Sequence, residues 1–235
     1  MKKNPLVTVY IPCRNYGKFL AIAIESVIRQ TYKEWELIII DEASEDNTEI
    51  IAKKYAKQYS SKIKFIKNKK PTGLQKVANN ILKNTKAKYM IRLDADDWLH
   101  EIALNEMVNK IELNNDAGII YGNYFYTSES GEIIGIEARH EINIKNQTSH
   151  LPPHGACTLF KIQDLRSVGG YFEDVDAQDG WDLWYKLFKK VGVINLDLPL
   201  FYYRQHSKSL SRDNDRLLDA RAKIFNEIRK KENKN

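Results

Sequence analysis

The sequence has very little cysteine, with Cys13 and Cys157 alone among 235 residues. Two isolated cysteines provide neither a disulfide framework nor the paired spacing of a zinc site. Glycine-rich nucleotide loops are also missing, because no G-x-G-x-x-G or P-loop pattern occurs. If the chain holds phosphates, it does so without the dinucleotide-binding device of Rossmann proteins.

Long apolar runs are absent as well. No segment approaches the roughly 18 apolar residues of a membrane span. The chain passes from Lys2 and Lys3 into a β-rich segment without the pattern of a signal peptide. We therefore expect a cytoplasmic protein, free or peripheral to the inner face of a membrane. A hydrophobic content of 43% and a charged content of 29% are those of an ordinary soluble globular protein.

Basic charge is concentrated near the C-terminal end. The net charge is +6, and residues 221–235 contain six basic side chains against two acidic ones. This composition favours a solvated helix end, and contact with anionic lipid headgroups is the alternative. The remainder is nearly balanced, so we expect no nucleic-acid partner.

The first hundred residues alternate between β-rich and helical segments. The expected strands are Leu6–Ile11, Glu36–Ile40, Ile63–Lys67 and Tyr89–Leu93, with helices between them. This alternation predicts a parallel sheet with right-handed crossovers. The loops after the strands then share the sheet edge where open α/β sheets bind ligands. These loops are Pro12–Asn15, Asp41–Ser44 and Asp94–Asp97.

The rest of the chain is expected to add a smaller set of strands and helices. An apolar stripe predicts a helix from Trp98 to about Ile111, and a second helix opens at about Gly180. A basic helix closes the chain. The expected strands are Gly118–Tyr126, Ile133–Ile136, Ala156–Phe160, Val193–Leu196 and Leu200–Tyr203. The polar segment Glu137–Pro153 has the length of a lid or binding loop.

Three carboxylates follow the fourth strand, at Asp94, Asp96 and Asp97. They repel one another unless a positive group lies among them. A hard divalent cation such as Mg²⁺ or Mn²⁺ accepts oxygen ligands and also binds phosphate oxygens. The alternative is a solvated turn in which Asp97 caps the next helix.

Five segments together resemble family 2 glycosyltransferases with the GT-A fold, over roughly Leu6 to Arg212. They are "VTVYIPCRN", "SVIRQTYKEWELIIIDEAS", "YMIRLDADDW", "GGYFEDVDAQDGWDLWYKL" and "YYRQHSKSLS". The resemblance implies an α/β fold, with a Rossmann-like, mostly parallel central sheet flanked by helices. It also implies a smaller acceptor-side sheet and a C-terminal helix. One domain over residues 1–212 is expected, with a nucleotide-sugar half (1–97), an acceptor half (98–212) and a basic tail (213–235).

The implied activity is inverting transfer of a hexose or N-acetylhexosamine from a nucleoside-diphosphate sugar to an acceptor hydroxyl. The acceptor would be a glycan or lipid-linked glycan, in bacterial surface polysaccharide or glycan assembly. The resemblance assigns Pro12, Arg14, Asn15, Asp41, Glu42 and Asn79 to the nucleotide, Asp94 and Asp96 to the ribose and metal, Asp179 to the catalytic base, and His206 to the metal and diphosphate. Glu42, Gln178 and Ala78 depart from the residues that the family usually has at their positions.

Several assignments leave alternatives open. Asp179 is placed at a helix N-terminus, where it could serve as a structural cap, and Asp182 is the reserve base. His206 could bind metal, bind phosphate or only form a hydrogen bond, and His154 could line an acceptor cleft or a turn. Arg204 and Arg212 suit diphosphate contact, with surface pairing as the alternative.

Two other functions fit parts of the pattern. A metal-dependent phosphotransferase would also use strand-end aspartates, but it would want them on the first strand. A non-catalytic nucleotide-sugar-binding module would tolerate Gln178 and Glu42. The sequence leaves the sugar, the nucleoside, the acceptor and the oligomeric state open.

Overall fold

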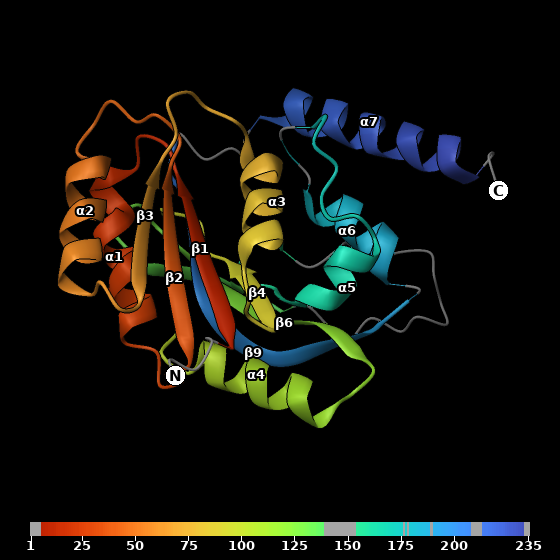
Figure 1. Ribbon diagram of the computed structural model, residues 1–235, viewed down its shortest axis with the longest axis horizontal. Coiled ribbons are helices and arrows are strands. Elements are labelled where there is room, and N and C mark those ends of the chain that lie inside the picture. Colours follow the sequence, from red (N-terminus) through yellow and green to blue (C-terminus); the bar gives the residue numbers. More distant parts are fainter. Residues whose placement is uncertain are drawn as a thin grey trace.

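The N-terminal half consists of the strand–helix units expected from the sequence. The computed structural model describes residues 6–138, 154–175, 177, 179–188, 190–207 and 213–232. The first elements are β1 (Val7–Cys13), α1 (Gly17–Ile28), β2 (Trp35–Asp41), α2 (Thr48–Gln58), β3 (Ile63–Lys67), α3 (Leu74–Asn84) and β4 (Tyr89–Arg92). β1 pairs in parallel with β2 and with β4, and Cys13 lies opposite Asp41. The predicted parallel sheet and the common edge of its loops are confirmed (Figure 1).

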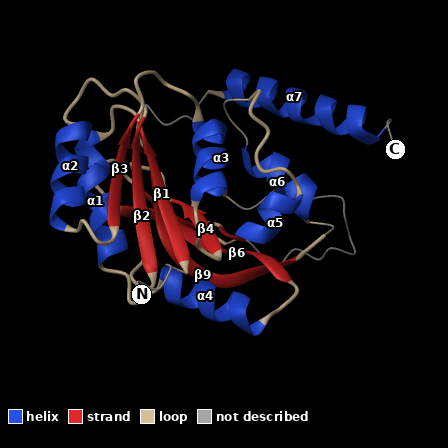
Figure 2. Cartoon of the chain, in the orientation of Figure 1, coloured by secondary structure: helices blue, strands red, loops and turns tan. Residues whose placement is uncertain are grey.

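The strands β1, β2 and β4 are buried on both faces because helices cover both. Side chains alternate between the faces along each strand. Val9 and Ile11 pack in one core with α1, α2 and α4 (Ala103–Leu113), whereas Tyr10 packs in a second core with α3, α5 (Ile162–Ser167) and α6 (Asp179–Leu187). Figure 2 shows α1 and α2 on one side of the red strands and α3 on the other.

The C-terminal half extends the same sheet with mixed pairing. It contributes β5 (Trp98–Leu99), β6 (Ala117–Thr127), β7 (Ile133–Glu137), β8 (Leu159–Lys161) and β9 (Gly192–Arg204). The order is β3-β2-β1-β4-β8-β6-β9-β5, with β7 paired to β6. The hairpin of β6 and β7 is confirmed. The helix α7 (Asn214–Glu232) closes the described chain as expected and lies beside α6 (Figure 1).

Three details differ from the sequence-based expectation. Trp98 is not helical, because it pairs with Tyr202 in β5 and the helix starts only at Ala103. The two expected last strands are one strand, since β9 continues through an irregularity in which Asp197 adopts a φ of 52°. The short helix α5 was not predicted. Residues 139–153, most of the suggested lid, lie outside the described residues.

Helix α7 docks by a small apolar contact. Ala220 and Ile224 are buried with Val175, and Arg221 lies over the Trp181 ring at 4.7 Å. Within the part of the chain that the structure describes, no helix has the length and apolar character needed to cross a membrane.

Candidate active site

The loop after β1 is tied to the loop after β2 by hydrogen bonds between backbone N–H groups and side-chain oxygens. Asn15 adopts a φ of 59°, which asparagine tolerates better than most residues. Its backbone N–H donates to Ser44 Oγ at 2.9 Å, and its side-chain oxygen accepts from the Glu45 N–H at 2.8 Å. Asn15 therefore joins two loops that the sequence alone only places at the same edge. Arg14 beside it is exposed, and Pro12 lies within β1.

Asp41 ends β2 as a fully buried carboxylate. One oxygen accepts a hydrogen bond from the Ser44 N–H at 2.8 Å. The other oxygen is buried without a partner among the described residues. Burying an unpaired carboxylate oxygen is costly, so this atom is suited to accept a hydrogen bond from a ligand.

The carboxylate of Glu42, which follows Asp41 in the sequence, is engaged by the segment that leads into α3. Its carboxylate accepts hydrogen bonds from the N–H groups of Thr72 at 2.7 Å and Gly73 at 2.8 Å, and from the Asn68 side chain. These contacts fix the start of α3. Glu42 is therefore a structural anchor.

Asp94 is held by the strand that precedes it. The buried guanidinium of Arg92 forms an ion pair with Asp94, with Nε 2.9 Å from Oδ1. The Asp94 side chain keeps 29% exposure. This carboxylate is thus oriented by a cation behind it and remains accessible at the sheet edge.

Asp96 meets His206 across 110 residues of sequence. Asp96 Oδ2 lies 2.8 Å from His206 Nε2. The His206 ring stacks on Phe19 at 5.5 Å and meets the edge of Tyr16 at 5.7 Å. Burial, and secondarily the charge of Asp94, raises the pKa of Asp96. A cation at this position would oppose that shift, because it favours the ionised carboxylate.

Asp96 and His206 are suited to serve as two protein ligands of a divalent ion. In an octahedral site with bonds near 2.1 Å, neighbouring ligand atoms lie about 3 Å apart. The Asp96 oxygen and the His206 nitrogen, at 2.8 Å, have nearly this separation. The described residues contain no cluster of three His, Cys, Asp or Glu side chains suited to hold a metal. Mg²⁺ and Mn²⁺ sites with one or two protein ligands take their remaining ligands from phosphate and water.

Arg204, for which diphosphate contact is expected, is engaged by two aromatic rings and two backbone carbonyls. Its guanidinium lies between the rings of Phe19 and Trp98, at 4.7 and 4.6 Å from their centres. Its Nε donates to the Asp96 carbonyl at 2.8 Å, and its Nη1 donates to the Glu129 carbonyl at 2.6 Å. Arg204 therefore clamps the turn that carries the carboxylates.

Asp97 completes this clamp. Its Oδ1 accepts a hydrogen bond from the Arg204 N–H at 2.8 Å, so it ties the end of β9 and does not cap a helix. Burial, followed by the charges of Asp96 and Asp94, raises the pKa of Asp97 well above its usual range. Because His206 follows Arg204 by two residues, the clamp also fixes the position of His206.

Asn79 and Asp182 also have structural partners. The Asn79 amide accepts from the Tyr171 N–H at 2.8 Å and donates to the Tyr171 carbonyl and to Glu173. The expected contact of Asn79 with the nucleotide stays a prediction. Asp182 accepts from the Phe172 N–H at 2.8 Å and pairs with Lys186 at 2.7 Å. The carboxylate of Asp182 is thus engaged in two structural contacts.

Asp179 is the first residue of α6, and its side chain lies outside what the structure describes. Gln178 and Arg212 also lie outside the described residues. His154 packs among Tyr124, Phe201 and Tyr203, with ring centres 4.9–5.5 Å apart, in an aromatic cluster behind the sheet edge.

The family is decided by comparison with known sequences. Residues 8–168 match the model of Glycosyl transferase family 2. The chain belongs to this family. EpsE of Bacillus subtilis (strain 168) is 30% identical over 217 residues, which cover 90% of this chain and 77% of EpsE. The poly(ribitol-phosphate) beta-N-acetylglucosaminyltransferase TarP of Staphylococcus aureus is 42% identical over 127 residues, covering 53% of this chain and 37% of TarP.

Solved structures show that the family 2 chain has the GT-A fold. The Pyrobaculum calidifontis mannosyltransferase PcManGT, solved with GDP-Man and Mn²⁺, gives a TM-score of 0.74 at 16% identity, over 97% of this chain and 65% of that one. Staphylococcus aureus TarS 1-349 with UDP-GlcNAc gives 0.73 at 17% identity, over 88% and 60%. The match spans about a third of the length of three Rickettsia relatives, for example 32% of an uncharacterised glycosyltransferase of Rickettsia bellii.

Sequence analysis missed several residues of this family 2 site. Tyr16 and Phe19 form the aromatic wall of His206, and Arg92 orients Asp94. The role of Arg92 could have been predicted from the sequence. It is the one charged residue of a buried strand, and residues two positions apart, such as Arg92 and Asp94, lie on the same side of a strand. The roles of Tyr16 and Phe19 could not, since their contact with His206 depends on how α1 packs.

Proposed function

We propose that this chain transfers a sugar from a nucleoside-diphosphate sugar to an acceptor hydroxyl, with inversion, as a hexosyl- or N-acetylhexosaminyltransferase. The observation that carries the proposal is the pairing of Asp96 with His206 beside Asp94, in a member of family 2. The unpaired oxygen of Asp41 at the same edge supports a nucleoside there. Residues 1–97 would hold the donor, and residues 98–212 would hold the acceptor.

Asp96 and His206 would hold Mn²⁺ or Mg²⁺, with Asp94 nearer the ribose. A bound divalent ion stabilises the negative charge that develops on a diphosphate leaving group. Arg204 and Asp97 keep the Asp96 turn and the end of β9 in register. Arg14 is the exposed cation of the first loop and is suited to the nucleotide phosphates.

Asp179 would remove the proton of the acceptor hydroxyl. Inversion by one displacement requires a single base on the acceptor side. The structure favours Asp179 over Asp182, because the Asp182 carboxylate already accepts from the Phe172 N–H and from Lys186. The acceptor would be a glycan or lipid-linked glycan of a bacterial surface polymer, and the names of relatives such as TarP support this class. Work in the cytoplasm, with α7 touching the membrane, belongs to the same proposal.

The donor role is tested by Mn²⁺-dependent hydrolysis of UDP-, GDP- and dTDP-sugars. We expect Asp96→Ala to abolish turnover while the protein stays folded. Glu101→Ala is the matched control, because Glu101 is an exposed acid outside the site. Equal turnover by Asp96→Ala and wild type, with or without a chelator, would remove Asp96 from the metal site.

The base is tested separately by transfer to an acceptor. We expect Asp179→Asn to bind the donor normally and to lose transfer. Asp182→Asn should transfer sugar but unfold more easily, because it weakens the pair with Lys186. Normal transfer by Asp179→Asn would place the base elsewhere.

A further inference from the structure

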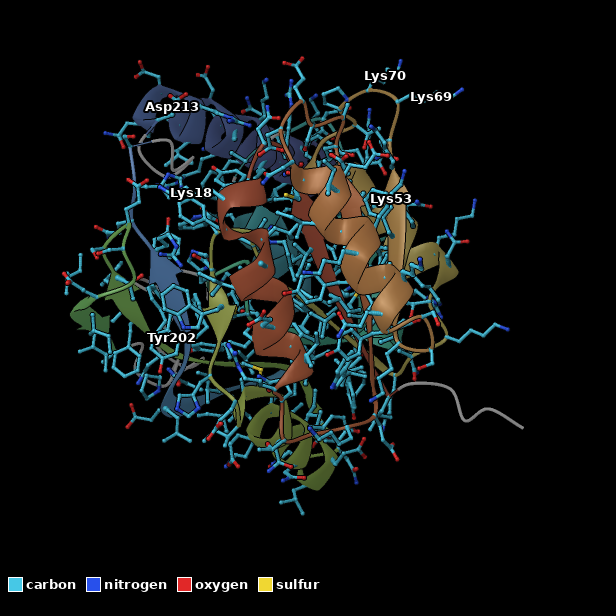
Figure 3. The ribbon with its side chains drawn as sticks, turned by 90° about the vertical axis from the view of Figure 1, so that its left-hand side faces the viewer. Lys18, Lys53, Lys69, Lys70, Tyr202 and Asp213 are labelled. Carbon is cyan, nitrogen blue, oxygen red and sulfur yellow. The ribbon has the colours of Figure 1, made fainter. Side chains whose placement is uncertain are left out.

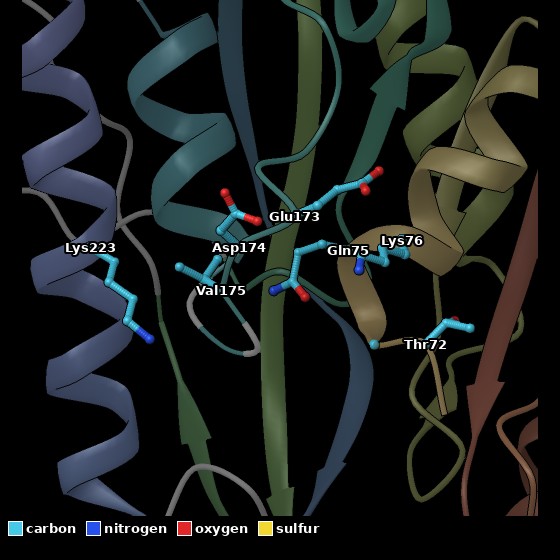
Figure 4. A pocket seen from close by; sticks show the side chains of 8 residues that line it. Thr72, Gln75, Lys76, Glu173, Asp174, Val175 and Lys223 are labelled. Atoms are coloured by element: carbon cyan, nitrogen blue, oxygen red, sulfur yellow. The ribbon is translucent and has the colours of Figure 1, made fainter. Parts of the chain in front are cut away.

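A second pocket lies between the start of α3, the segment Glu173–Val175 and helix α7. Its volume is about 300 Å³, and none of its lining residues belongs to the Asp96–His206 site. Figure 4 shows Lys223 reaching it from α7 and Gln75 from α3. In Figure 3, Lys69 and Lys70, which precede α3, and Asp213, which precedes α7, lie at the upper end of the molecule. The pocket lies near the edge that carries the donor loops, because α3 follows β3, whose last residue Lys67 pairs with Asp41.

Gln75 is a buried amide that lacks a partner in this pocket. Gln75 is only 2% exposed, and its Nε2 has no hydrogen-bond partner within the described part of the chain. Figure 4 shows its carboxamide extending into the space between α3 and α7. An unpaired buried N–H donor destabilises the protein unless a ligand supplies an acceptor.

The start of α3 provides further donors around Gln75. Glu42 occupies the N–H groups of Thr72 and Gly73, which fixes the helix entrance. Among the described residues, no acceptor is seen for the N–H groups of the first turn, Leu74 to Lys76. α3 has 11 residues, so its N-terminus carries the positive end of a helix dipole.

Charged side chains complete the lining. The ammonium groups of Lys76 and Lys223 add donors, and Glu173 and Asp174 add carboxylates. Glu173 accepts a hydrogen bond from Asn79 at 2.7 Å, so part of its acceptor capacity is used. The two ammonium groups balance the two carboxylates in charge. The Gln75 amide and the N–H groups of the first turn of α3 then leave more donor groups than acceptor groups, so the complementary ligand is an anion rich in acceptor oxygens.

We propose that this pocket binds a phosphate group, held by the α3 N-terminus, the Gln75 carboxamide and Lys223. This phosphate is distinct from the donor diphosphate placed at the Asp96–His206 site, and it belongs to a nucleotide bound without metal or to a phosphorylated acceptor. Binding at this pocket requires neither the divalent ion nor sugar transfer, so it can be tested even if the proposed function fails. Lys223 lies beyond residue 168, where the family match ends.

The test is calorimetric titration of the whole chain with sodium pyrophosphate in the presence of EDTA, which keeps the Asp96–His206 site free of metal. We expect Lys223→Gln to weaken pyrophosphate binding at least about fivefold, since one charge-assisted contact is lost. Asp174→Asn should strengthen binding by removing a repelling carboxylate. Lys230→Gln, on the same helix but outside the pocket, is the matched control and should bind like wild type.

Two further arms identify the source of the phosphate. Titrations with UDP and GDP probe a nucleotide bound without metal, and titration with glycerol 3-phosphate probes a phosphorylated acceptor. The arm whose affinity falls in Lys223→Gln, and not in Lys230→Gln, names the source. A wild-type chain that fails to bind pyrophosphate, or equal affinities in the two lysine variants, would overturn the proposal.

Gln75→Met separates a ligand-binding role from a structural one. Methionine keeps the length of the side chain and removes the unpaired amide. We expect weaker pyrophosphate binding together with a melting temperature raised by about 2–4 °C, because an uncompensated polar group is gone. A lowered melting temperature with unchanged pyrophosphate affinity would show that Gln75 is structural and would overturn its part in the site.

Discussion

Replacing Arg204 with lysine tests whether this residue is a clamp or a ligand. The guanidinium is buried between Phe19 and Trp98, and it donates to the carbonyl groups of Asp96 and Glu129. An ammonium group can reach at most one of these two carbonyls in the same geometry, and it lacks the flat surface that packs against the rings. Arg204→Lys therefore removes one of the two hydrogen bonds and weakens the two ring contacts, while the positive charge is kept.

The expected loss follows from these contacts. A hydrogen bond from a charged donor contributes about 1.5–3 kcal/mol, and a desolvated cation–π contact contributes about 0.5–2 kcal/mol. Because a lysine keeps part of each, we expect the free energy of unfolding to fall by about 2–4 kcal/mol. Urea denaturation measures this change as a lower midpoint at an unchanged slope. Arg29→Lys is the control, since exposed Arg29 pairs only loosely with Glu25 at 3.3 Å and should change stability by less than about 0.5 kcal/mol.

The same variant should also loosen the metal site. The Asp96 turn loses its side-chain clamp, so we expect a higher Mn²⁺ requirement for donor hydrolysis, with activity restored by excess Mn²⁺. An Arg204→Lys protein of wild-type stability that binds the donor far more weakly would refute this reasoning. That result would make Arg204 a direct diphosphate ligand, as the sequence suggested.

Three further predictions concern buried acids and thiols. Glu42→Gln should lower the free energy of unfolding by about 1–3 kcal/mol, measured with urea, because an NH₂ group then faces donors at the start of α3; unchanged stability would contradict the anchor role. Burial raises the pKa of Asp97, so its stabilising contribution is present below its unfolded pKa and is lost as pH rises through the folded pKa. Asp97→Asn should therefore flatten the decline in melting temperature with rising pH, and a curve parallel to wild type would contradict this. Burial raises the pKa of Cys13 to about 12, so native protein should resist alkylation of Cys13 near pH 8, as read by mass spectrometry, and rapid native labelling would contradict it.

Much of the fold could be predicted because it depends on local pattern. The strands β1 to β4 are short apolar runs separated by helical spacing, and each signal lies within about ten residues. The same locality placed Asp41 and Asp94 at strand ends. The pattern failed at Trp98, where pairing with Tyr202, a residue more than a hundred positions away, decided between strand and helix.

The location of the site could be predicted, and the resemblance named Asp96 and His206, but the partners of the other side chains could not be predicted. Glu42, Asn79 and Arg204 lie at or near the predicted edge, but their side chains are engaged with Gly73, Tyr171 and other distant partners. Residue type is the same for a ligand and for an anchor. The direction of the side chain and the identity of its neighbour separate the two roles, and neither is encoded in local spacing.

The sequence by itself determined an α/β chain with carboxylates at the ends of its parallel strands, because periodicity acts over short distances, and five of its segments carried the resemblance to family 2. Only the tertiary structure decided that Asp96 meets His206, that Arg204 and Asp97 clamp this pair, and that Gln75 faces a pocket without a partner. These contacts join segments far apart in the chain, and packing of the whole fold selects them.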